Sequence, residues 1–230
     1  MISFIWFAAK PPHDLAYPAR AWATLLDLPD PSGRGARRIN EAILWLEDNS
    51  LIEVENRAGQ PSIVRLLSET GTGERYELPG AAYNRLRNKP DADAHRYIQL
   101  PNELWTSGWI TVLSGAALAM LLVLYAELGN QKPETTNLWF SPRQADLQYG
   151  LSEDTRTKGL RELRAAGLVT ARRQSIAPDT FDFQRLRNVY RLETHHLQQP
   201  AELPEDLTPP PALTPSEASV ADLFGPAFRR

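Results

Sequence analysis

The stretch "LSEDTRTKGLRELRAAGLV" (151–169) decides how this chain is expected to fold. Ser152 stands where a helix needs an N-cap, and Gly167 suits the left-handed end of a helix. Between them, Leu160 and Leu163 lie on one helical face. The apolar pair that follows the glycine suits the start of a strand. The stretch therefore predicts a basic amphipathic helix, a tight turn and a strand in succession.

A degenerate copy of this pattern lies 117 residues earlier in the chain. The segment "GARRINEAILWLEDNSLIEVENR" (35–57) aligns with "SEDTRTKGLRELRAAGLVTARRQ" (152–174), so that apolar positions of the helix and of the strand coincide. Ser50 falls on Gly167, which predicts a left-handed or turn conformation at the end of both helices. The chain is therefore expected to contain the helix and strand pattern twice.

The segments around each copy extend this prediction. Before the second copy, Pro142 is placed to begin a short helix that ends at Gly150. After the second copy, residues 168–173 and 188–192 are predicted to form two strands. The first copy continues into "LIEVENRAGQPSIVRLL" (51–67), whose alternating apolar residues and central glycine predict a β-hairpin.

One apolar stretch raises the alternative of a membrane span. No charged residue occurs between Glu103 and Glu127, and most of this segment is apolar. Threonine, serine and glycine residues interrupt its first half, and Ser114 is placed to cap the shorter helix "SGAALAMLLVLYAEL" (114–128). The segment is therefore predicted to be a buried core helix, with no membrane partner.

Composition limits the class of protein. The chain has 230 residues, of which 42% are hydrophobic, so it can bury a core and is not wholly disordered. It contains no cysteine, which excludes zinc fingers and disulfide frameworks and fits a cytoplasmic location. The N-terminal "MISFIWFAAK" has no basic residue ahead of its short apolar run, so no signal peptide is expected.

The net charge of −3 is distributed unevenly along the chain. Residues 1–84 carry 8 Lys and Arg against 11 Asp and Glu (net −3), and residues 85–192 carry 15 against 11 (net +4). Residues 193–230 carry 2 against 6 (net −4). A negatively charged partner is therefore expected to bind a local basic surface of the middle region.

Shifts in composition predict four segments. Residues 1–80 form a first domain, residues 81–96 a polar connector, residues 97–193 a second domain and residues 194–230 a disordered tail rich in proline. The tail contains "ASVADLFGPAF" (218–228), which is either an unstructured end or a linear motif that folds on a protein partner. The apolar residues of this motif are Val220, Leu223, Phe224 and Phe228.

In this order of elements, the chain resembles the winged-helix family of DNA-binding domains. The segments "LSGAALAMLLVLYAEL", "SPRQADLQYG" and "SEDTRTKGLRELRAAG" are similar to the three helices of that family, and "LVTARR" and "NVYRL" to its wing strands. The resemblance implies a fold that is mainly α with small β wings (α+β), made of two winged-helix domains in tandem with a disordered Pro-rich C-terminal tail.

Several residues depart from the family pattern. Arg156 stands where an apolar residue is usual, and Gly159 where alanine is common, although glycine costs a helix up to about 1 kcal/mol. The first domain looks like a degenerate or incomplete member of the family. Either the domain is incomplete at its start or its first helix is replaced by a strand from "ISFIWF" (2–7).

The resemblance implies contacts between double-stranded DNA and the outward faces of the recognition helices and wing. Arginine and lysine bind phosphates, and arginine also pairs with the edge of guanine. The alternative for each charged side chain is a solvated surface position. The expected DNA-binding residues are Thr155, Thr157, Lys158 and Arg161 in the second recognition helix, Arg143 in the helix before it, Arg172, Arg173, Arg185 and Arg187 in the wing, and Arg34, Arg37 and Arg38 in the first copy.

The sequence predicts no enzyme, no cofactor and no metal site, and the adjacent His195 and His196 are interpreted as a surface pair. The expected function is sequence-specific DNA binding by a bacterial or phage transcriptional regulator, acting as a monomer or a homodimer. One alternative is a plasmid or phage replication initiator that binds iterated sites. Another is a winged-helix protein-interaction module, which Leu44 and Trp45 would suit because both are expected to point away from the core.

Overall fold

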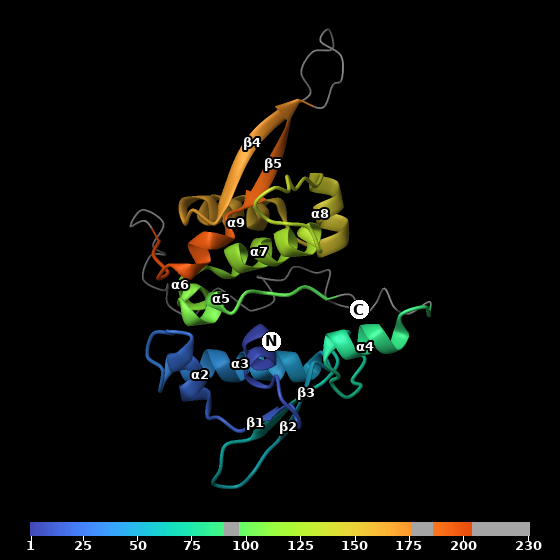
Figure 1. The fold of residues 1–230 in the computed structure, drawn as a ribbon. Helices are drawn as coiled ribbons and strands as arrows, with labels where there is room; N and C mark the ends of the chain where they lie inside the picture. Colours follow the sequence, from blue (N-terminus) through green and yellow to red (C-terminus); the bar gives the residue numbers. More distant parts are fainter. Residues whose placement is uncertain (90–96, 176–185, 204–230) are drawn as a thin grey trace. The chain divides into compact units, whose positions relative to one another are not determined.

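The structure is a computed structural model that describes residues 1–89, 97–175 and 186–203 (Figure 1). The chain divides into two compact units, Met1–Tyr97 and Ile98–Arg230, and each is described by itself. Both combine helices with a small antiparallel sheet, which confirms the mixed class expected from the sequence. Part of the expected connector, and residues 204–230 of the expected disordered tail with its motif of Val220, Leu223, Phe224 and Phe228, lie outside the described residues. The first residues of that expected tail are instead ordered: the 3-10 helix η2 (Thr194–Gln198) places Leu197 in the core of the second unit, so this unit extends beyond the predicted boundary at residue 193.

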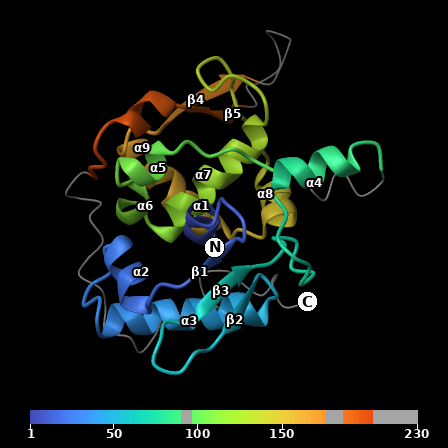
Figure 2. The same ribbon diagram turned by 60° about the horizontal axis from the view of Figure 1, so that its bottom comes forward.

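The first unit contains a three-stranded antiparallel sheet of order β1-β3-β2. Figure 2 shows α3 beside this sheet, and the core joins Phe4, Trp22, Ile39 and Val64 from four different elements. The unit includes α4, which occupies the start of the expected connector. Its elements are α1 (Ile2–Phe7), β1 (Asp14–Leu15), α2 (Ala19–Leu25), α3 (Arg34–Asp48), β2 (Ile52–Glu55), β3 (Ile63–Leu66) and α4 (Pro79–Leu86).

The N-terminal segment "ISFIWF" is a helix, so the prediction of a strand there is wrong. Phe4 and Ala8, one helical turn apart, are both buried in the core of the first unit. Aromatic residues favour strands, but this preference is weak and the burial of one helical face outweighs it. The third strand of the sheet instead comes from β1, which pairs with β3.

The first copy of the repeated pattern forms α3, a turn and β2, as predicted. Ile39 and Leu46 of α3 are buried, whereas Leu44 is 58% exposed. Trp45 packs partly against the core of the unit, so the prediction that it points away from the core is wrong. The large indole reaches the core from the margin of the buried face of the helix.

The second unit has one hydrophobic core, to which Leu104, Trp109, Met120, Leu163 and Leu192 contribute. Figure 1 shows its two-stranded hairpin extending beyond the helices of the unit. Its elements are α5 (Glu103–Thr106), α6 (Trp109–Val112), α7 (Gly115–Leu128), α8 (Pro142–Tyr149), α9 (Glu153–Ala165), β4 (Val169–Ser175), β5 (Leu186–Leu192) and the 3-10 helix η2 (Thr194–Gln198).

Helix α7 is the central helix of this core, as predicted from its sequence. The hydroxyl of Ser114 accepts a hydrogen bond from the amide of Ala117, which is the expected N-cap. Buried residues occur around most of the helix, including Met120 and Leu124, both fully buried. Within the described ranges, the chain has no helix whose length and apolar character would let it cross a membrane.

Helix α9 packs against α7 at a contact that only glycine permits. A Cβ atom at Gly159 would lie 2.3 Å from the carbonyl oxygen of Ala116 and 2.8 Å from Cγ of Met120. The close approach explains why glycine occupies a helical position where alanine is the better helix former. One turn along α9, the carboxylate of Glu162 accepts hydrogen bonds from the amide and the hydroxyl of Ser114, at 2.6 and 2.5 Å.

Apart from α4 in the first unit and α5, α6 and η2 in the second, the two units share one order of elements. This order is a helix, a short extended segment paired with the last strand, two helices and a hairpin. The extended segment is β1 in the first unit. In the second, Leu138 exchanges backbone hydrogen bonds of 2.7 and 2.8 Å with Tyr190. Ser50 (φ 55°) and Gly167 (φ 71°) both adopt the left-handed conformation, which confirms the prediction for the two helix ends.

Replacing Gly159 by alanine is expected to destabilise the second unit. The added methyl overpacks the contact with Ala116 at a cost of roughly 1 to 3 kcal/mol, which exceeds the up to about 1 kcal/mol that alanine gains in helix propensity. Urea unfolding measures the difference. Gly115→Ala is the control, because nothing lies within 4 Å of its added Cβ. A Gly159→Ala protein at least as stable as the wild type would contradict the tight contact.

Candidate functional site

The outward face of α9 carries three of the predicted residues, Thr157, Lys158 and Arg161, and all three are exposed. The ammonium of Lys158 pairs with the carboxylate of Asp154 at 2.7 Å, one turn earlier on the helix. An exposed pair of this kind contributes only about 0.3 to 0.5 kcal/mol to stability, so the helix does not depend on it. The face therefore offers two cations and a hydroxyl to a ligand.

Thr155 belongs to the N-cap of α9 more than to its outward face. Its amide donates a 3.2 Å hydrogen bond to the hydroxyl of Ser152, and the two hydroxyls lie 2.9 Å apart. The side chain is half-buried. The structure thus gives Thr155 a structural role in starting the helix.

Two further arginines of α9 were not among the predicted DNA-binding residues. Arg156 donates a hydrogen bond to the carbonyl of Leu151, so a guanidinium at a usually apolar position ties the helix to the preceding turn. Arg164, which the sequence analysis missed, is exposed one turn beyond Arg161. Its spacing of three residues from Arg161 is the signal that could have identified it.

Helix α8 precedes α9 and carries Arg143, whose side chain is exposed as predicted. The helix is anchored through Tyr149, whose hydroxyl donates a 2.8 Å hydrogen bond to the carboxylate of Glu127 on α7. Burial, together with this hydrogen bond to a negative partner, raises the pKa of Tyr149. The neutral phenol therefore holds the end of α8 beside the central helix.

The hairpin of the second unit carries exposed Arg172 and Arg173 on β4. Arg187 on β5 is half-buried, and its guanidinium lies 5.0 Å from the centre of the Trp139 ring, within the range of a cation–π interaction. Trp139, itself 43% exposed, was missed by the sequence analysis, because its neighbour is 48 positions away in sequence. Arg185 lies outside the described residues.

The first unit presents Arg34, Arg37 and Arg38 at the start of α3, and all three are exposed. The carboxylate of Asp30 accepts a 2.9 Å hydrogen bond from the amide of Arg34 and lies 4.0 Å from its guanidinium. Asp30 therefore satisfies the first amide of α3, whose N-cap residue is Gly33, and partly neutralises the first of the three arginines of the helix.

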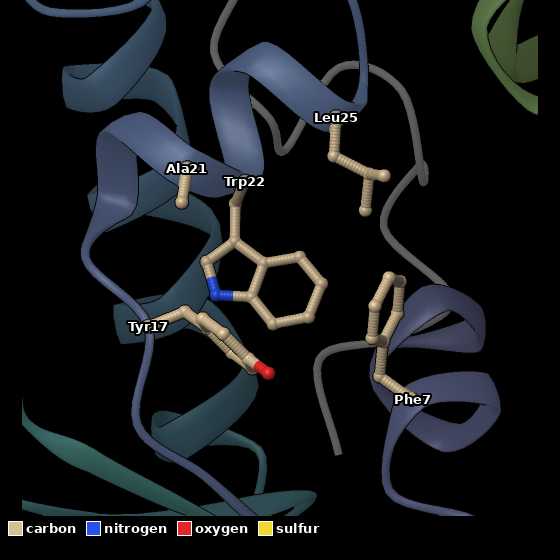
Figure 3. A pocket seen from close by; sticks show the side chains of 5 residues that line it. All are labelled: Phe7, Tyr17, Ala21, Trp22 and Leu25. Carbon is tan, nitrogen blue, oxygen red and sulfur yellow. The ribbon is translucent and has the colours of Figure 1, made fainter.

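The first unit also has an aromatic hollow of about 190 Å³ (Figure 3). The rings of Trp22, Tyr17 and Phe7 are in mutual contact: the centroid of Trp22 lies 5.9 Å from that of Tyr17 and 5.3 Å from that of Phe7, and its ring is nearly perpendicular to both. Leu25 and Ala21 complete the lining. The sequence analysis missed this hollow, which depends on the unexpected helix α1; the aromatic residues in "YPARAW" (17–22) were its only local signal.

A metal centre has no support in the described part of the chain, where no group of three His, Asp or Glu side chains could hold an ion. His195 and His196 have ring centroids 4.2 Å apart, and His195 lies 4.0 Å from the carboxylate of Glu193. That carboxylate also accepts hydrogen bonds from Thr170 and Arg191, at 2.9 and 3.0 Å. Glu193 therefore joins the end of the hairpin to η2.

Comparisons of the chain with known protein families, with curated proteins and with solved structures give no significant match. In the second unit, α9 leads through Gly167 directly into β4, so an exposed basic helix and a hairpin with arginines belong to one compact body. Such a surface can bind a polyanion and can offer hydrogen-bond donors to it.

Replacing Tyr149 by phenylalanine is expected to loosen α8. The loss of one hydrogen bond, worth about 1 kcal/mol, corresponds to roughly fivefold faster amide hydrogen exchange in residues 142–149. In the wild type, this anchoring is present below the ordinary tyrosine pKa of 10.0 and decreases as the pH rises above it, because the fold favours the neutral phenol. Tyr17→Phe is the control, and unchanged exchange in Tyr149→Phe would contradict the anchoring role.

Proposed function

We propose that the protein is a sequence-specific, double-stranded DNA-binding protein built from two winged-helix units in tandem, acting as a cytoplasmic transcriptional regulator. The observation that carries the proposal is the exposed basic face of α9, fixed from behind by the contact of Gly159 with α7 and followed at once by a hairpin rich in arginine. A rigid helix with an outward basic face and an adjacent basic hairpin fits the shape and charge of a DNA groove and its phosphates.

The side chains on this surface support both phosphate binding and base reading. Arg161 can pair with the O6 and N7 atoms of guanine, whereas Lys158 and Thr157 can bind bases or phosphates. Arg143 at the start of α8 and Arg172 on the hairpin are exposed cations on either side of α9 in the chain. We assign them to phosphates, where they would set the position of the helix.

A replication initiator is the alternative within DNA binding. Two units with the same order of elements in one chain would suit iterated sites, such as those of a plasmid or phage origin. Either function is compatible with a monomer that occupies two half-sites or with a homodimer. Bound fragments near promoters favour the regulator, and bound fragments with repeated sites beside AT-rich sequence favour the initiator.

A protein-interaction role is the second candidate for the first unit alone. Its aromatic hollow and the exposed Leu44 favour this role, because exposed apolar side chains are frequent at protein interfaces. Such a role does not conflict with DNA binding by the second unit.

The double variant Lys158→Ala/Arg161→Ala is expected to weaken binding to preferred DNA fragments about 10- to 100-fold, because a good arginine–guanine pair contributes roughly 1 to 3 kcal/mol. Fluorescence anisotropy with duplex fragments of the native genome, measured across a salt series, tests this. Arg87→Ala/Lys89→Ala removes the same charge from exposed positions of the first unit and is the matched control.

The outcomes separate the candidates. Loss of fragment preference in the first variant, with the control unchanged, supports base reading by α9. An equal loss of DNA affinity in both variants indicates a general charge effect and contradicts base recognition by α9. Absence of salt-dependent binding by the wild type would reject DNA binding and leave the interaction module.

A further inference from the structure

The two hairpins occupy equivalent places in the two units but have opposite charge. Strands β4 and β5 contain four arginines, Arg172, Arg173, Arg187 and Arg191, and no carboxylate. Strands β2 and β3 contain two glutamates, Glu53 and Glu55, and one arginine, Arg65. Since both hairpins follow a helix in the same order, their difference in charge comes from their side chains.

Carboxylates surround the cations of the first hairpin. Arg65 lies opposite Glu53 in the ladder, with its guanidinium 3.8 Å from that carboxylate, and it also donates a hydrogen bond to Glu55. On the other side, Asp14 of β1 is its ladder partner. Arg57, in the loop of the hairpin, lies 3.9 Å from Glu55. Hydrogen bonding and attraction from Glu55, and attraction from Glu53 and Asp14, raise the pKa of Arg65.

These two arginines and three carboxylates give the cluster a net charge of −1. The ion pairs are exposed and contribute little to stability, so the fold does not depend on them. They do change the surface that a phosphate would meet, because each arginine is already beside a carboxylate that repels the phosphate. The pairing in the second hairpin differs, since Arg191 alone pairs with a carboxylate among the described strand residues.

We infer that Glu53 and Glu55 determine which of the two hairpins binds DNA phosphates, because they pair with Arg57 and Arg65 and so prevent the first hairpin from binding phosphates. Of the two hairpins, only that of the second unit then contacts DNA. The inference rests on the proposed DNA binding, which it deepens by assigning the phosphate contacts of the wings to one hairpin. It makes Glu53 and Glu55 specificity-determining residues that act through their arginine partners.

The test removes the negative charges of Glu53 and Glu55 and leaves both arginines in place. Glu53→Gln/Glu55→Gln is expected to bind a random-sequence duplex about 10-fold more tightly, with a salt dependence that is steeper by about one to two phosphate contacts. Glu69→Gln/Glu74→Gln is the matched control: it removes the same charge from exposed positions of the first unit whose carboxylates form no ion pair within the described residues. Adding Arg57→Ala/Arg65→Ala to the first variant should abolish the gain.

An equal gain in the test and control variants, or a gain that persists without Arg57 and Arg65, would overturn the inference. Heparin affinity separates this failure from failure of the proposed function. If the wild type binds no duplex even at low salt, DNA binding is rejected. In that case, elution of Glu53→Gln/Glu55→Gln from heparin later than the control supports the inference that the two glutamates block anion binding by Arg57 and Arg65. Equal elution of the two variants rejects it.

Discussion

The contact between α7 and α9 is the constraint on which the second unit depends. Gly159 lets the two helix backbones approach to a distance that any side chain would prevent, and Glu162 joins the same helices by binding the start of α7. Both interactions use the inner face of α9. The outer face carries the exposed pair of Lys158 and Asp154 but takes no part in the contact with α7, and this is why its exposed cations can bind a ligand.

In the first unit, the close approach of two helices involves different residues and a different pair of helices. Ala42 stands at the position that aligns with Gly159, and the close approach moves to the start of α3, where a Cβ at Gly35 would lie 3.1 Å from Cβ of Ala23 on α2. Helix α1 adds aromatic rings to the core, and Phe7 reaches the rim of the hollow. The repeat thus preserves the order of elements while each copy has its own contacts.

The sequence predicted the parts of the fold that depend on local signals. Ser114, Ser152, Ser50 and Gly167 mark helix ends, and each does so in the structure. It failed where neighbours distant in sequence decide the outcome. The segment "ISFIWF" forms a helix because one of its faces is buried. Trp139 contacts Arg187 because the second strand of the hairpin passes beside it. Of the predicted site, exposure on α9 followed from the helical period. The ion pair of Lys158 and the capping role of Thr155 depend on side-chain conformations, which the period does not determine.

The net charge of a region predicts a polyanion-binding surface less well than the ion pairs of its individual arginines do. Residues 1–84 and 85–192 differ in net charge, −3 against +4, but this count treats every arginine as available. In the first unit, Arg65 lies beside Glu53 and Glu55, and Arg34 lies beside Asp30, so much of its positive charge is already engaged. Arg172 and Arg161 have no such partner among the described residues. Two units with a similar order of helices and strands can therefore bind different partners when carboxylates lie beside the cations of one hairpin and not of the other.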